Sequence, residues 1–222
     1  MEKERLITVK GIGTLTVPVN YIEIQFHLRE TNKEYEKGYD LFEKHILDLQ
    51  NTLTSCGFEK KELKTSEVNV VPDYDRVKKN GRYTEALKGY DFRADLILRF
   101  DFDSQKLADV IKSVSKSKSA PEIEIDFTVK DKEAVKKNLL VASAKDAKEK
   151  ADLLCEAMNV KLGKLLTINY NWDEITIHSP TNYRLEDPKK LELCCCERSL
   201  IDFTPDDIRV NDDASFVWEI TD

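Results

Sequence analysis

The chain has 222 residues, 41% of them hydrophobic and 9% aromatic, which is enough for a sizeable core in one large domain or two small ones. Its net charge of −7 argues against a nucleic-acid partner, because phosphate binding needs a basic surface. No stretch reaches the roughly 18 apolar residues of a membrane span, so none is expected.

The N-terminus and the cysteine content favour a cytoplasmic location for the sequence as given. Residues 1–5 are charged and lead straight into a strand pattern, without the apolar segment of a signal peptide. The five cysteines, three of them adjacent, do not resemble a secreted disulfide framework. A periplasmic or exported protein is the alternative if the sequence is a processed or trimmed form.

The first 28 residues indicate strands. Residues 6–9 and 14–17 predict two short strands, separated by Gly11-Ile12-Gly13, which we interpret as a turn or bulge. These glycines do not predict a phosphate loop, because the third glycine and the following helix are missing. Residues 21–28 alternate strictly between apolar and polar side chains, which is typical of a strand with one buried face.

The next hundred residues predict a repeated pattern of helices and strands. Residues 35–53 predict a helix that covers a sheet, and 103–114 predict another, capped by Asp103 or Ser104. The pattern predicts further strands at 63–71, 92–100 and 123–129, with a polar loop or ragged hairpin at 72–88 that turns at Asn80-Gly81. Residues 21–129 therefore predict the βαββαβ order of ferredoxin-like units.

The longest helical pattern runs from Asp131, a predicted N-cap, to Asn159, a predicted helix end. We predict one buried stripe, whose small middle should let the helix lie close against a sheet: Leu140, Ala144, Ala147, Ala151, Leu154 and Met158.

Residues 163–172 and a final stretch with Phe216, Trp218 and Ile220 predict two more strands, while 178–204 is interpreted as a variable surface loop. The predicted fold class is α+β, a mostly antiparallel sheet with helices packed on one face. In it, residues 130–222 add a long helix and C-terminal strands to the 21–129 unit, and the whole chain, 1–222, forms one domain.

The candidate chemistry lies in the Cys194-Cys195-Cys196 triplet of the predicted loop. On an extended chain Cys194 and Cys196 share a face while Cys195 points away, so a zinc site would need a further ligand such as His178. An incidental thiol cluster on a variable loop is the other interpretation.

The remaining cysteines and histidines do not predict a site. Cys56 and Cys155 are predicted to be buried apolar residues, and His27, His45 and His178 are scattered along the chain. We expect no catalytic residue, no cofactor and no enzymatic activity.

Several motifs, in this order and spacing, resemble the SIMPL family, bacterial proteins of which many are periplasmic or serve in oxidative-stress defence. They are Ile7-Thr8-Val9-Lys10-Gly11-Ile12-Gly13-Thr14, Tyr21-Ile22-Glu23-Ile24, Leu63-Lys64-Thr65-Ser66, Pro72-Asp73-Tyr74-Asp75, Asn80-Gly81, Gly89-Tyr90, Asp146-Ala147-Lys148-Glu149-Lys150-Ala151, Gly163-Lys164, Pro205-Asp206-Asp207-Ile208-Arg209-Val210 and Trp218-Glu219-Ile220. The resemblance implies an α+β domain, frequent homo-oligomerisation and no established catalytic activity.

These observations together predict a non-enzymatic protein of unknown biochemical activity that acts by self-assembly or by binding another protein, in stress response or envelope biology. The alternative is a thiol-based redox or metal-binding protein that uses Cys194, Cys195 and Cys196. Residues 6–17 carry few charges that would guard a sheet edge, so we expect them to join a neighbour's sheet. The population of the homo-oligomer should rise with ionic strength, because salt screens the net negative charge.

Overall fold

The computed structural model describes residues 5–79, 82–170, 175–186 and 203–222. Within these ranges the strands form two antiparallel sheets, which confirms the predicted α+β class. The elements are β1 (Leu6–Val17), β2 (Tyr21–Asn32), α1 (Tyr35–Ser55), a 3-10 turn (Lys60–Glu62), β3 (Lys64–Lys79), β4 (Arg82–Asp101), α2 (Ser104–Ser115), β5 (Glu122–Thr128), α3 (Lys132–Ala157), β6 (Lys161–Tyr170), β7 (His178–Leu185) and β8 (Ile208–Thr221).

The chain divides into two compact units. Unit 1 comprises Met1–Val19, Thr128–Pro180 and Asp206–Asp222, and unit 2 comprises Asn20–Phe127 and Thr181–Pro205. The β1-β8-β6 sheet and α3 lie in unit 1.

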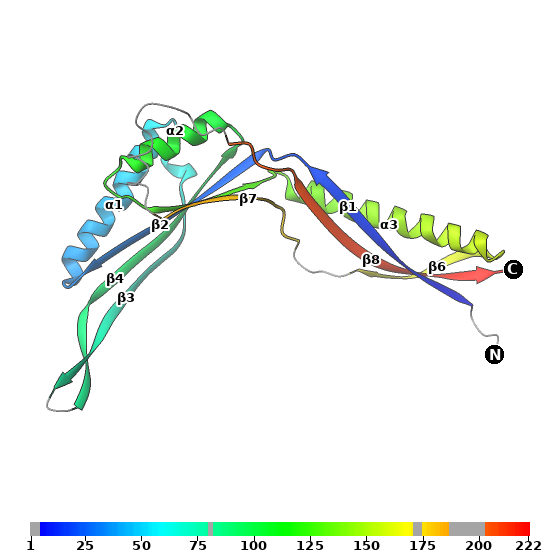
Figure 1. Cartoon of the computed structure of the whole chain (residues 1–222), viewed down its shortest axis with the longest axis horizontal. Coiled ribbons are helices and arrows are strands. Elements are labelled where there is room, and N and C mark those ends of the chain that lie inside the picture. The colour runs from blue at the N-terminus through cyan, green and yellow to red at the C-terminus, as the bar shows by residue number, and fades with distance from the viewer. Residues whose placement is uncertain (1–4, 80–81, 171–174, 187–202) are drawn as a thin grey trace. The chain divides into compact units, whose positions relative to one another are not determined.

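Unit 2 contains the predicted βαββαβ arrangement. Its strands lie in the order β3-β4-β2-β5-β7, and α1 and α2 cover one face (Figure 1). The predicted alternation of β2 is confirmed, because Ile22, Ile24 and Phe26 are fully buried. Helix α2 begins at the predicted cap, where the Asp103 carboxylate accepts the Lys106 N–H at 2.9 Å.

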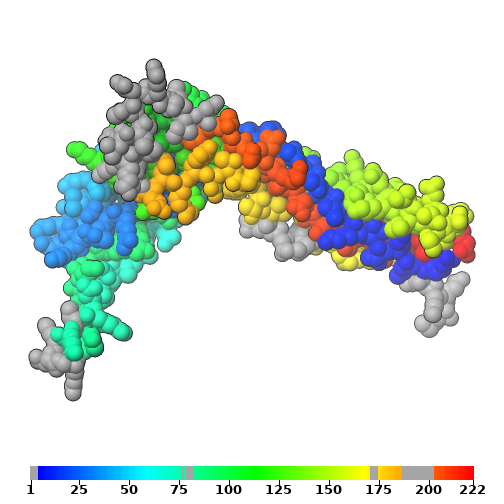
Figure 2. All heavy atoms as spheres, in the orientation of Figure 1, coloured from blue at the N-terminus to red at the C-terminus, as the bar shows by residue number. Residues whose placement is uncertain are grey.

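Of the two interpretations of residues 72–88, a polar loop or a ragged hairpin, the structure confirms the hairpin. Strand pairing between β3 and β4 continues as far as Lys79 and Arg82, with a register shift between Asp73 and Tyr74. The expected turn, Asn80-Gly81, lies outside the described residues. Since β2 pairs with β4 only as far as Tyr90, residues 72–79 and 82–89 form a two-stranded ribbon, here called the arm (Figures 1 and 2).

The predicted loop at 178–204 is wrong in its first part, because residues 178–185 form strand β7. Two prolines and the cysteine triplet favour a loop over these residues, and of these Pro180 lies in the strand, where it cannot donate a backbone hydrogen bond. At the edge of a sheet that missing donor costs no ladder bond, and β7 lies at the edge beside β5. Tyr183 packs its ring against Phe127 and Phe203, at centroid distances of 5.8 and 5.0 Å, within unit 2.

Unit 1 has its core between α3 and the sheet. The central strand β8 supplies Ala214, Phe216 and Trp218, which are buried as the alternation predicted. Toward the other end of α3, a second group of buried side chains contains Val135, Leu139, Ile177, Ile208 and Val210.

Strand β1 is continuous, so the predicted turn or bulge at Gly11-Ile12-Gly13 is wrong. Its register with β8 is unbroken from Leu6 to Val17. A Cβ atom at Gly11 would overlap the Ser143 carbonyl oxygen, and one at Gly13 would overlap that of Leu139. The two glycines therefore let α3 lie directly on β1, which agrees with the close helix–sheet contact that the sequence predicts.

Helix α3 begins as predicted, with the Asp131 carboxylate accepting the Ala134 N–H at 2.8 Å, but it turns a different face to the sheet. In the predicted stripe Ala147 and Ala151 are buried, while Leu140, Ala144, Leu154 and Met158 are exposed. The buried residues recur at every fourth position: Val135, Leu139, Ser143, Ala147, Ala151 and Cys155. Because a helical turn has 3.6 residues, positions four apart shift gradually around the helix. The face of α3 that contacts the sheet therefore rotates along the helix, as the twist of a sheet requires.

Candidate interaction surface

Strand β6 exposes apolar side chains at an open edge of the unit 1 sheet. Within the described ranges β6 pairs with β8 alone. Leu165 and Leu166 are each 46% exposed and Ile168 is 55% exposed. The register places Leu165 opposite Trp218 and Ile168 opposite Phe216, on the face that carries α3. Because α3 lies mainly over β1, it does not cover Leu165 and Ile168, and both side chains are exposed in the described part of the chain.

The opposite edge, β1, is held by two side chains of α3. The Ile12 N–H donates to the Asp146 carboxylate at 2.7 Å, and Lys150 donates to the same carboxylate at 2.6 Å. Lys150 also lies 3.4 Å from the Lys10 carbonyl oxygen. The hydrogen bonds from Lys150 and Ile12 lower the pKa of Asp146, so the carboxylate stays ionised. The middle of this edge is therefore bound within the chain.

The end of α3 adds to the apolar surface of unit 1. Leu153, Leu154 and Met158 are exposed, although they lie where the helix leads into β6. Exposed apolar residues of this size are common when they are scattered singly, so these three do not by themselves identify an interaction site.

Unit 2 exposes large side chains on the arm. Tyr74, Tyr83 and Leu87 are exposed, and the Lys78 ammonium lies 5.8 Å from the centre of the Tyr83 ring. A ribbon of two strands has no core of its own, so its side chains remain available for contacts.

The buried carboxylate of Asp91 has a structural role. Arg29 from β2 donates to it through Nε and Nη2 at 2.9 and 3.0 Å, and Arg93 donates through Nε at 2.9 Å. The bonds from Arg29 lower the pKa of Asp91 against the effect of burial, and Asp91 in turn raises the pKa of Arg29. This network joins β2 to β4.

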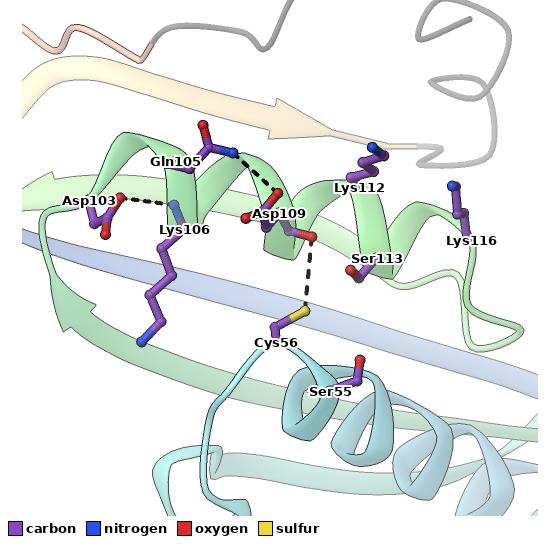
Figure 3. A pocket seen from close by; sticks show the side chains of 9 residues that line it. All are labelled: Ser55, Cys56, Asp103, Gln105, Lys106, Asp109, Lys112, Ser113 and Lys116. Atoms are coloured by element: carbon purple, nitrogen blue, oxygen red, sulfur yellow. Dashed lines mark hydrogen bonds between the residues drawn. The ribbon is translucent and has the colours of Figure 1, made fainter.

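A hollow of about 600 Å³ lies between the end of α1 and α2 (Figure 3). Its polar groups serve the local structure: Gln105 donates to Asp109 at 3.3 Å, and the Lys106 ammonium lies 3.9 Å from the centre of the Phe58 ring. Cys56 lies here half-buried, so its predicted full burial is wrong. Its thiol is 3.9 Å from the Asp109 carbonyl oxygen, and no histidine stands among the lining residues to activate it.

The predicted metal or thiol site cannot be assembled from the described residues. Cys194, Cys195 and Cys196 lie outside them. His178 Nε2 lies 3.2 Å from the Lys132 ammonium, whose charge disfavours a metal ion at that nitrogen. Within the described ranges no three His, Cys, Asp or Glu side chains are placed to hold a metal ion.

The other residues considered for chemistry lie apart. His27 pairs with Asp95 at 2.7 Å, and His45 lies 3.6 Å from Glu30. Cys155 is buried in α3 as predicted. No helix in the described part of the chain is long and apolar enough to cross a membrane.

Sequence reasoning missed the open surface on β6, although a signal for it was present. Leu165 and Leu166 are adjacent, and two neighbours on a strand point to opposite faces, so both cannot enter one core.

The comparisons with known proteins agree with the resemblance found in the sequence. No curated protein matches the chain. The model of the SIMPL family, described as a protein of unknown function (DUF541), matches residues 7–191. That range covers most of the chain and parts of both units, so the protein belongs to the SIMPL family.

Proposed function

We propose that this SIMPL protein is non-enzymatic and works by self-assembly, with the open edge of β6 as its contact with a second copy. The observation that supports this most strongly is the exposure of Leu165, Leu166 and Ile168 on a strand that, among the residues the structure describes, pairs on one side only. An unpaired strand offers a row of backbone donors and acceptors, and apolar side chains beside it make pairing with another chain favourable. The family resemblance supports a role in stress response or envelope biology.

The charges on β6 favour antiparallel pairing of two copies. Its lysines, Lys161 and Lys164, both lie in the first half of the strand. Antiparallel pairing centred on Leu166 keeps the lysines of the two copies apart, whereas an in-register parallel arrangement would place them side by side. The centre of the contact is then the apolar sequence Leu165-Leu166.

The free energy gained by burying apolar side chains at this edge is moderate. Completing the burial of three half-exposed aliphatic side chains contributes about 1 kcal/mol each, or about 6 kcal/mol for two copies. Association costs an estimated 4 to 15 kcal/mol in lost freedom of motion. The β6 edge alone therefore supports a weak dimer, and a tight assembly needs the new backbone hydrogen bonds or a second contact.

Replacing Leu166 and Ile168 together by Lys tests the proposal. Two ammonium groups per copy at the centre of the contact should convert the assembly to monomers, as measured by size exclusion with light scattering. The control is Ile12→Lys, which places one ammonium group at an exposed residue of the β1 edge, where Asp146 binds the backbone, and should leave the assembly unchanged.

Ionic strength provides a second test. The net charge of −7 makes copies repel each other at low salt, so the wild-type oligomer should increase at high salt. A wild-type protein that stays monomeric at high concentration in both buffers would refute self-assembly.

A further inference from the structure

One face of the arm carries three rows of paired side chains. Directly opposite each other across β3 and β4 are Tyr74 and Leu87, then Arg76 and Glu85, then Lys78 and Tyr83. All six side chains are exposed, with Tyr83 at 71%.

Each row joins two groups that attract one another. The first row is apolar. The second places the guanidinium of Arg76 opposite the carboxylate of Glu85, and in the third the Lys78 ammonium lies 5.8 Å from the centre of the Tyr83 ring. If a second arm is laid on this face by a two-fold axis parallel to the strands, each β3 residue meets the β4 residue of its own row. Tyr74 then covers Leu87, Arg76 covers Glu85, and Lys78 covers Tyr83, and every contact occurs twice.

We propose that the arm docks face to face on the arm of a second copy of this chain, with both arms pointing the same way. The inference rests on the proposed self-assembly and adds a second contact, independent of β6. The arrangement is specific, because a two-fold axis across the strands would place Arg76 on Arg76 and Glu85 on Glu85. The opposite face of the arm lacks this complementarity, since there Asp75 is paired with Ala86.

The size of the contact indicates its role in the assembly. Three rows on a two-stranded ribbon cover less than the roughly 800 Å² per partner of a standard interface. The arm contact is therefore weak alone, with an expected dissociation constant of about 0.1 to 1 mM.

A charge-exchange mixture tests this proposal. Arg76→Glu gives an arm with two acidic groups in the middle row, and Glu85→Arg gives one with two basic groups. Each variant alone should lose association by about tenfold or more, because like charges meet twice. An equimolar mixture should regain nearly wild-type association, since the acidic row of one copy then meets the basic row of the other. Within each variant arm the middle row still pairs two groups of like charge, so only contact between the two copies explains the recovery.

The measurement is sedimentation equilibrium at about 0.1 to 1 mM, made on protein that also carries Leu166→Lys and Ile168→Lys, so that β6 does not contribute. The matched control is Asp75→Arg, which adds a basic group on the other face of the arm and should associate like its parent.

Three outcomes would overturn the arm proposal: a parent that stays monomeric, single variants that associate like the parent, or a mixture that is not rescued. Failure of the β6 contact would show separately, as unchanged assembly of the β6 variant in the test of the proposed function.

Discussion

The two edges of the unit 1 sheet differ in how they are completed. At β1, α3 approaches so closely that Gly11 and Gly13 have no room for a side chain, and Asp146 binds the Ile12 N–H. At β6, Leu162 and Tyr170 pack against the core, but Leu165 and Ile168 between them remain about half exposed. One helix is too narrow to cover three strands, so the residues that fold the sheet lie at one edge and those available for binding lie at the other.

This difference separates two kinds of apolar residue. Those packed between α3 and β8 determine stability, while Leu165, Leu166 and Ile168 of β6 contribute little to the folded monomer and can serve an interface. Substitutions at the centre and at the two edges should therefore give distinct results.

The largest effect is expected at the central strand. Trp218→Ala should lower the free energy of unfolding by about 3–5 kcal/mol, because a buried aromatic side chain is replaced by a cavity. Leu165→Ala, directly opposite in register but half exposed, is the control and should cost about 1 kcal/mol. Equal losses in urea denaturation would contradict the assignment of the core to the α3 side of β8.

The next largest effect on stability is expected at the β1 edge, which α3 covers. Gly11→Ala should cost about 2–3 kcal/mol, because the new methyl group overlaps the Ser143 carbonyl oxygen and α3 must move away. Ser215→Ala, at the half-buried position on β8 next to the Gly11 partner, should be nearly neutral. A Gly11→Ala protein with unchanged thermal stability would show that α3 does not lie on β1.

A smaller effect is expected from the carboxylate that holds this edge. Asp146→Ala should cost about 1–2 kcal/mol through the loss of its bonds to Ile12 and Lys150. Because folding lowers the pKa of Asp146, its contribution is present above the ordinary value of 3.8 and is lost as the pH falls through the folded-state pKa.

Acidification should therefore narrow the difference in stability between wild type and Asp146→Ala. Urea denaturation of both proteins at neutral pH and below pH 3.8 measures this change. A difference that stays constant or widens in acid would contradict the role assigned to the carboxylate.

The smallest effect on stability is expected at the open edge. Ile168→Lys should change the free energy of unfolding of the monomer by less than about 0.5 kcal/mol, since a half-exposed site tolerates a flexible charged chain. Measured in dilute solution, a large destabilisation would show that β6 belongs to the core and is not a binding edge.

Much of unit 2 could be predicted from the sequence, because its central strands bury one face. Ile22, Ile24 and Phe26 alternate with polar residues, and this period of two identifies both the strand and its inner side. Strand β7 could not be recognised in the same way, because the tolerance of Pro180 depends on a position at the sheet edge that only the fold reveals.

The contacts of α3 could be predicted only in part. The spacing predicts the helix and its small middle, but it also predicts that Leu154 and Met158 face the sheet, and both are exposed. Contact with the glycines of β1 selects small residues instead, such as Ala147. The open edge of β6 depends on strand order, which local periodicity does not contain.

Hydrogen exchange measured at increasing protein concentration tests the β6 contact most directly. The amides of β6 that do not bond to β8 should exchange rapidly in dilute solution and become protected as copies associate, while those of β1 should show the same exchange throughout. If an oligomer forms and the β6 amides remain unprotected, or if protection appears along β1 instead, copies do not join through β6.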